Sequence, residues 1–194
     1  MKKITLFMMA LLVSVASMAE IVVEKVWENS TDAPTNAKNV GGYDGVLYCK
    51  NYSTGEIFAY SAEGRTVLVN EGTASDYGFT TDDAGNIIHK TGSLGSGNPS
   101  KMNLYLKGST VAIPITFEGM GGRTDFITAV GDFSSAEGGR VYFYPAGLTT
   151  VKYVEIKNAN AETQTADVTV GELGTVAVAG TSRSEEHTSE LQSQ

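Results

Sequence analysis

The chain has 194 residues, a formal net charge of −8 at neutral pH and a single cysteine, Cys49. An acidic chain without a basic run argues against nucleic acid or an anionic membrane surface as a partner, because both need clustered lysine and arginine. One cysteine excludes an internal disulfide framework, so buried apolar surface must stabilise the fold.

Residues 1–19 have the pattern of a secretory signal peptide. Lys2 and Lys3 give a positively charged start, residues 4–15 form an apolar run, and residues 17–19 fit a small-residue cleavage site. The apolar run is shorter than the roughly 20 residues of a spanning helix, and no other stretch approaches that length. We therefore expect cleavage before Glu20 and an exported protein without a membrane span, located in the periplasm, at the cell surface or outside the cell.

The clearest structural signal is a three-strand antiparallel meander over residues 45–68. Strands are predicted at residues 46–50, 57–61 and 66–69, because these runs are rich in β-branched and aromatic residues and each connection carries a glycine. Before this meander, residues 20–27 form a predicted strand and residues 29–39 a polar loop.

After the meander, short strands continue along the chain. The residue pattern predicts them at residues 87–90, 101–107, 110–117, 124–130, 140–144, 151–157, 163–170 and 175–179. Gly108 and Ser109 are expected to form a two-residue turn with glycine first, and Pro114 indicates an edge strand or a bulge. No segment outside the signal peptide has helical periodicity, so the predicted class is all-β.

A repeat runs through these strands. Gly45, Gly85 and Gly139 each precede a short apolar strand, at spacings of 40 and 54 residues, and each is followed by a second strand, at residues 57–60, 104–106 and 151–154. Four-stranded meanders repeated every 40 to 50 residues are typical of propeller blades. We therefore predict a partial β-propeller of about three to four antiparallel blades over residues 20–182. The alternative is a set of β-sandwich modules, which the same density of strands could build.

Three stretches also resemble a known kind of repeat. The blades of exported, uncharacterised β-propeller proteins of Bacteroidetes-type bacteria resemble the stretches VWENSTDAP, GYDGVLYCKNYSTGEIFAYSAEG and YGFTTDDAGNII. The sequence pattern of these blades is similar to that of NHL and gluconolactonase-like repeats. The resemblance extends from Val26 to Lys157. It implies a propeller fold and an export route, and it carries over no catalytic residue.

The C-terminal residues need a separate interpretation. Residues 183–193, RSEEHTSELQS, resemble one translated frame of a common short-read sequencing adapter and match it at every codon. We therefore expect residues 183–194 to be an artefact tail, the natural protein to continue past Ser182, and the truncated propeller to self-associate through open sheet edges. The alternative is a polar C-terminal tail.

One turn gathers the only cluster of carboxylates, amide and imidazole. Asp82, Asp83 and Asn86 are weak candidates for a Ca²⁺ site, because a calcium loop presents alternating oxygen ligands. Here the two aspartates are adjacent and Asn86 follows Gly85, so a structural turn stabilised by Asp and Asn side chains fits the spacing better. Nearby His89 is expected to be a strand histidine with satisfied nitrogens, with general-base chemistry as the alternative.

The remaining candidates point to binding more than to catalysis. Cys49 lies in an apolar strand and is expected to be a buried hydrophobe, with the Lys50 side chain on the opposite face. Nine tyrosines and Trp27 give aromatic surface, most of it packed between blades and some able to stack on a sugar ring.

No catalytic constellation is visible. We therefore predict a non-catalytic binding or protein-interaction platform, with a protein or glycan as ligand. The alternatives are a lactonase-like or polysaccharide-active propeller enzyme with catalytic residues partly in missing blades, and a purely structural role.

Overall fold

The computed structural model describes residues 37–72, 78–91, 100–118, 124, 126–143 and 150–175. The predicted signal peptide at residues 1–19, the strand predicted at residues 20–27 and the predicted artefact tail from residue 183 lie outside the described residues. Every regular element of the described part is a β-strand, so the all-β prediction is confirmed. None of the described residues belongs to a helix that could cross a membrane.

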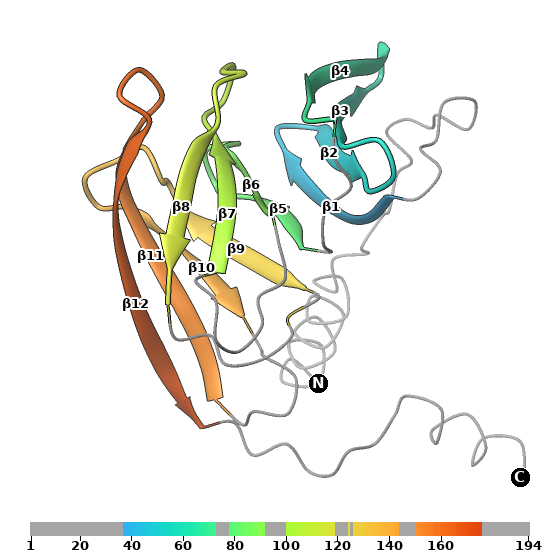
Figure 1. Ribbon diagram of the computed structural model, residues 1–194. Helices are drawn as coiled ribbons and strands as arrows, with labels where there is room; N and C mark the ends of the chain where they lie inside the picture. The colour runs from blue at the N-terminus through green and yellow to red at the C-terminus, as the bar shows by residue number, and fades with distance from the viewer. Residues whose placement is uncertain are drawn as a thin grey trace, which may run out of the picture.

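Within the described ranges, twelve strands form three four-stranded antiparallel sheets (Figure 1). Sheet A contains β1 (Ala37–Tyr43), β2 (Val46–Asn51), β3 (Glu56–Ser61) and β4 (Gly64–Asn70). Sheet B contains β5 (Phe79–Thr81), β6 (Ile87–Lys90), β7 (Ser100–Tyr105) and β8 (Ile113–Phe117). Sheet C contains β9 (Ile127–Gly131), β10 (Gly139–Phe143), β11 (Thr150–Asn160) and β12 (Thr165–Thr175). In each sheet the strands are neighbours in chain order, so each sheet is a simple meander.

The predicted meander is confirmed as β2, β3 and β4, but the sequence interpretation missed the strand before it. β1 begins at Ala37, inside the segment predicted as a loop. Its sequence contains two glycines and reads as irregular. A Cβ atom on Gly41 would lie 2.6 Å from the backbone nitrogen of Thr81 on β5. The close approach of β1 to β5 therefore explains why residue 41 is a glycine, which local strand propensity does not.

The predicted Gly-first turn between β7 and β8 is wrong. Gly108 has φ of 78°, and the Ser109 N–H donates to the Leu106 carbonyl over 2.8 Å. The central turn residues are therefore Lys107 and Gly108, with glycine second, where the positive φ falls. Pro114 lies on β8, the outermost strand of sheet B, which confirms the predicted edge position.

The repeat found in the sequence corresponds to equivalent places in the three sheets. Gly45 and Gly85 lie just before the second strands β2 and β6, and Gly139 begins the second strand β10. The strand predicted to follow each of them is the third strand of its sheet, β3, β7 or β11. The repeat is therefore structural: each copy marks the same turn of a four-stranded meander.

The sheets stack face to face with sheet B in the middle. One face of sheet B packs on sheet C in a large apolar cluster that includes Ile88, Leu104 and Ile115 from sheet B and Val141, Phe143 and Val154 from sheet C. The other face packs on sheet A through a smaller cluster of Ile57, Phe79, Ile87 and Tyr105. The first strands of the sheets lie near one another, β1 beside β5 and β5 beside β9 (Figure 1).

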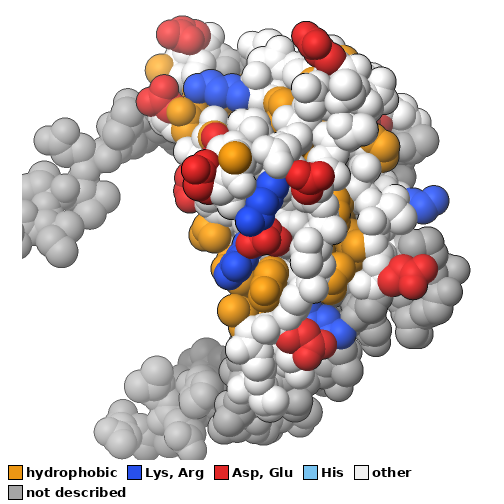
Figure 2. All heavy atoms as spheres, turned by 90° about the vertical axis from the view of Figure 1, so that its left-hand side faces the viewer, with side chains coloured by type: hydrophobic (Ala, Val, Ile, Leu, Met, Phe, Trp, Pro, Cys, Tyr) orange, Lys and Arg blue, Asp and Glu red, His pale blue; other side chains and the backbone are white. Residues whose placement is uncertain are grey.

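The outer face around β11 and β12 is more polar than the interfaces between the sheets. Figure 2 shows acidic and basic side chains scattered among hydrophobic ones on this side of the molecule. An ion pair between Lys152 and Glu172, at 3.2 Å, links β11 to β12. A second ion pair, between Lys157 and Glu155 at 3.2 Å, lies within β11. This face of the described structure is therefore more polar than the two interfaces between the sheets.

Replacement of Phe143 tests the packing of sheets B and C. Its ring is buried and lies 5.9 Å from the ring of Phe117 on sheet B. Phe143→Ala removes this contact and leaves a cavity, so we expect a loss of about 3–5 kcal/mol in the free energy of unfolding. Urea denaturation measures the loss. Val130→Ala, at an exposed site on the neighbouring strand, is the control and should change stability by about 0.5 kcal/mol or less. Equal midpoints for the two variants would contradict this packing.

Candidate functional site

Strand β2 sends neighbouring side chains to opposite faces of sheet A. Cys49 packs with Phe58 and Tyr60 on the face away from sheet B. Burial raises the pKa of the Cys49 thiol to about 11, an effect that the charge of Arg65 only partly opposes. A thiol with this pKa carries little thiolate at neutral pH, so the expectation of a buried hydrophobe is confirmed.

Lys50, the next residue, points toward sheet B and enters a buried polar network. Its ammonium group is inaccessible to solvent and donates to Oε2 of Glu71. The other oxygen of Glu71, Oε1, lies 2.9 Å from Nε2 of His89 and accepts hydrogen bonds from Asn103 at 2.9 Å and from the Tyr105 hydroxyl at 2.5 Å. Glu71 follows β4 in the connection between the sheets, so its carboxylate links a sheet A lysine to three sheet B side chains.

His89 lies at the centre of this network. Its side chain is 1% exposed, and Nδ1 lies 2.9 Å from the Lys90 carbonyl oxygen and 3.4 Å from the Lys50 ammonium nitrogen. The imidazole stacks between Phe79 and Tyr105, with centroids 6.5 and 6.0 Å away. Both ring nitrogens have partners, so the prediction of a satisfied strand histidine is confirmed.

The network shifts the protonation equilibria of its members. Burial opposes the ionisation of Glu71, but hydrogen bonds from His89, Lys50 and Tyr105 outweigh it and hold the pKa of Glu71 well below the ordinary 4.5. Burial lowers the pKa of Lys50, and the Glu71 carboxylate acts in the opposite direction. Burial and the hydrogen bond to Glu71 raise the pKa of Tyr105. We infer an ionised carboxylate at Glu71 that stabilises the ammonium of Lys50.

A second buried lysine occupies the equivalent place in sheet B. Lys50 and Lys90 each follow the repeat glycine of their sheet by five residues and face the next sheet along the chain. Lys90 is 2% exposed and donates to the Thr124 carbonyl, in the connection between β8 and β9. Each of these lysines therefore holds the connection that leads to the next sheet.

The candidate calcium ligands form the turn between β5 and β6. Asp82 accepts four hydrogen bonds, from the backbone N–H groups of Ala84, Asn86 and Phe133 and from the Asn86 amide, at 2.7–3.0 Å. Burial raises the pKa of Asp82, while these donors favour its carboxylate and limit the rise. The oxygens of Asp82 are therefore occupied by N–H donors, which favours the structural turn over a calcium site.

The other candidate ligands are engaged in the same way. Asp83 Oδ2 accepts the Gly131 N–H at 2.7 Å, and Asn86 Oδ1 accepts the Lys107 N–H at 2.9 Å. The Asn86 amide also donates to Asp132 at 3.2 Å, so this turn fastens sheet B to the β9–β10 turn of sheet C. In the described part of the chain, no three His, Cys, Asp or Glu side chains form a group suited to a metal ion.

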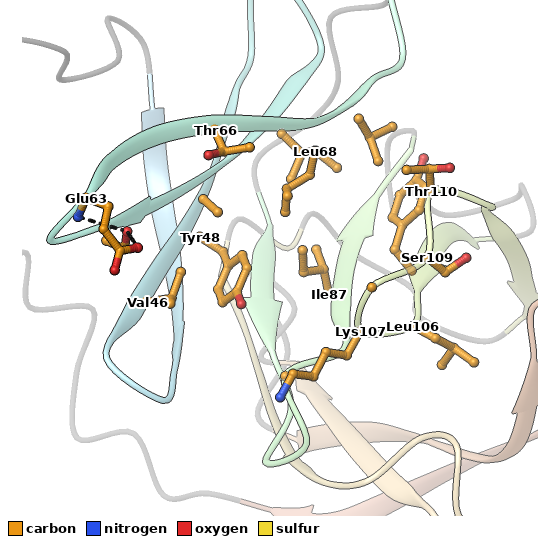
Figure 3. A pocket seen from close by; sticks show the side chains of 17 residues that line it. Val46, Tyr48, Glu63, Thr66, Leu68, Ile87, Leu106, Lys107, Ser109 and Thr110 are labelled. Carbon is orange, nitrogen blue, oxygen red and sulfur yellow. Dashed lines mark hydrogen bonds between the residues drawn. The ribbon is translucent and has the colours of Figure 1, made fainter.

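A cleft of about 460 Å³ opens between sheets A and B. Its lining is mainly apolar and includes Val46, Tyr48, Ile57, Leu68, Ile87 and Leu106. Figure 3 shows Tyr48, Leu68 and Ile87 directed into the cleft from both sheets. The volume lies in the range of pockets that hold small ligands.

The cleft and the polar network share a residue. The ring of Tyr105 lines the cleft, while its hydroxyl donates to Glu71. The network therefore fixes one part of the cleft lining in place. Neither the cleft nor Glu71 was among the candidates from the sequence, because both depend on contacts between sheets. Seven of the nine tyrosines belong to the described residues, four in sheet A and three in sheets B and C, and those of sheet A are buried or half-buried. Tyr77, Tyr144 and Trp27 lie outside the described residues.

A comparison with protein-family models and a comparison with curated proteins each find no match to this chain.

Acidification tests the network through Glu71. Because the pKa of this carboxyl is lowered in the folded state, its contribution to stability is complete above the ordinary value of 4.5 and is lost as the pH falls below it. Glu71→Gln removes the titrating group. We therefore expect wild type to be more stable than Glu71→Gln at pH 7 in urea denaturation, and this advantage to shrink steadily toward pH 3. An advantage that is constant between pH 7 and pH 3 would show that Glu71 is not the stabilising carboxylate.

Proposed function

We propose that the three sheets are successive blades of a β-propeller, and that the protein is an exported platform for binding a protein or glycan ligand. The geometry of stacking supports the blade interpretation. Each sheet is a four-stranded meander, the sheets stack in chain order, and their first strands lie together. Propeller blades surround a central axis in this arrangement.

The stacking is also directional. Tyr48 and Lys50 on β2 face sheet B, and Ile88 and Lys90, at the equivalent places on β6, face sheet C. The same face of each sheet therefore covers the next sheet along the chain. A repeated head-to-tail contact of this kind generates a ring when the rotation closes, and propellers typically have 4–8 blades.

This arrangement favours the propeller over the sandwich alternative. A β-sandwich encloses one core between two sheets, and the outer face of each sheet is polar. Sheet B instead has apolar clusters on both faces. In this proposal the three described sheets are neighbouring members of a larger ring.

The cleft between sheets A and B carries the binding function. It combines an apolar lining with polar groups at the margin, such as Glu63, Thr66 and Lys107. Pockets that recognise ligands have this composition. The enzyme alternative has less support, because it needs converging carboxylates that include Asp82 or Asp83, and the oxygens of Asp82 are taken by four N–H donors.

Binding arrays test this proposal. The chain is produced with its own leader in a Gram-negative host, recovered from the periplasm with Glu20 as the expected first residue, and applied to a glycan array and a peptide array. We expect retention on one of the arrays. Ala59 lines the cleft, so Ala59→Trp should fill it and weaken retention about tenfold or more. Ala62→Trp, at an exposed turn residue outside the cleft, is the matched control. No retention on either array, or equal retention of both variants, would refute the binding function of the cleft.

A further inference from the structure

We propose that the cleft between sheets A and B binds an extended peptide, with an apolar side chain inserted between the sheets, its backbone along the free edge of β4 and an acidic residue beside Lys107. This inference rests on the proposed function and names the ligand class of the same site. Three features of the described residues carry it: the shape of β4, the division of the lining into apolar and polar parts, and the charge at one end.

Strand β4 contains an irregularity that aims side chains into the cleft. Ile57 on β3 is paired with Val69, and Phe58 is paired with Val67, so Leu68 is an extra residue in β4. As a result Leu68 and Val69 both pack toward sheet B, while Val67 on the other face is 47% exposed. A bulge that redirects a side chain in this way is a common device at binding sites. Here it adds Leu68 to the apolar wall.

The polar groups of the cleft are arranged for a peptide. The deep lining offers few hydrogen-bond partners, because it is formed by side chains such as Ile57, Leu68 and Ile87, and the Tyr105 hydroxyl already binds Glu71. A sugar ring in this position would lose the hydrogen bonds of its hydroxyl groups. An apolar peptide side chain has no such cost, and its backbone would remain at the margin, near Thr66 and Thr110.

The edge of β4 supplies the backbone partner. β4 is the last strand of sheet A, and within the described ranges no strand pairs with its outer edge. Outward N–H and C=O groups on an edge strand are a template for an added strand. Peptides that bind by strand addition use these groups for affinity and a neighbouring pocket for specificity. The cleft is such a pocket, because Thr66, Leu68 and Val69 of β4 line it.

Lys107 sets the preferred charge of the part of the peptide beside it, whereas Glu63 at another place on the margin does not attract an acidic residue. Its ammonium group lies 4.2 Å from the centre of the Tyr43 ring, and no acidic side chain among the described residues forms an ion pair with it. The residue is exposed at the margin of the cleft. A peptide carboxylate would complement this charge. We therefore expect selected peptides to combine an apolar anchor with an aspartate or glutamate.

Phage display of random dodecapeptides against the immobilised chain tests the inference. Enriched peptides are synthesised with a fluorescent label, and dissociation constants are measured by fluorescence polarisation. Leu68→Arg places a charge inside the cleft and should weaken binding about tenfold or more, since one buried anchor carries much of the affinity of such interfaces. Val67→Arg, the adjacent substitution on the far face, should leave binding unchanged. Lys107→Glu should weaken peptides that carry an acidic residue.

Each result decides the question. If Leu68→Arg unfolds the chain, as urea denaturation would reveal, Thr66→Arg at the exposed margin replaces it. Peptides that bind Leu68→Arg and wild type equally would overturn the inference. The absence of enriched peptides would also overturn the inference. If the glycan array retains the chain through the cleft in that case, the proposed binding function remains intact. Self-association that disappears in Leu68→Arg would identify a second copy of the chain as the occupant and would also overturn the inference.

Discussion

Strands β5 and β6 of sheet B can be stable only between two other sheets, and the arrangement of the three described sheets follows from this constraint. All seven residues of β5 and β6 are buried, so neither face of these two strands meets water. The outer strand β8 differs, because Pro114 and Thr116 are exposed on it. Sheet C covers one face through a cluster of twelve buried residues, and sheet A covers the other through a cluster of four. Because each additional apolar group buried adds stability, the interface with sheet C is the stronger of the two.

The weaker interface is also the one that contains polar groups and the cleft. Where apolar packing between sheets A and B ends, Lys50, Glu71 and His89 form a buried network, and the unfilled space beside it is the cleft. A buried charge without a partner destabilises a protein, whereas a paired one can fix how two elements meet. Lys90 has a similar position in the next interface, where it binds the Thr124 carbonyl. Apolar faces permit many ways of stacking two sheets, and we infer that these lysines select one.

The sequence predicted the features that depend on neighbouring residues. The meander of β2, β3 and β4 and the repeated glycines are local signals, because strand preference and turn chemistry act within a few residues. Features set by contacts between sheets were not predictable in this way. β1 was missed because Gly41 is required by Thr81 of another sheet, and Glu71 was missed because its partners lie 18 to 34 residues away in the sequence. The Asp82 turn was identified from the sequence, but its contact with Phe133 of the next repeat was not.

Native-state hydrogen exchange would test most directly whether sheet B is the centre of the structure. If both faces of sheet B are covered, the amides of Ile88 and Leu104, which pair across β6 and β7, should exchange only when the whole chain unfolds. Amides of the outer strands β4 and β12 should exchange faster, through local opening. Exchange at Ile88 and Leu104 as fast as in β12 would contradict the account, because it would mean that sheet B opens without the sheets that cover it.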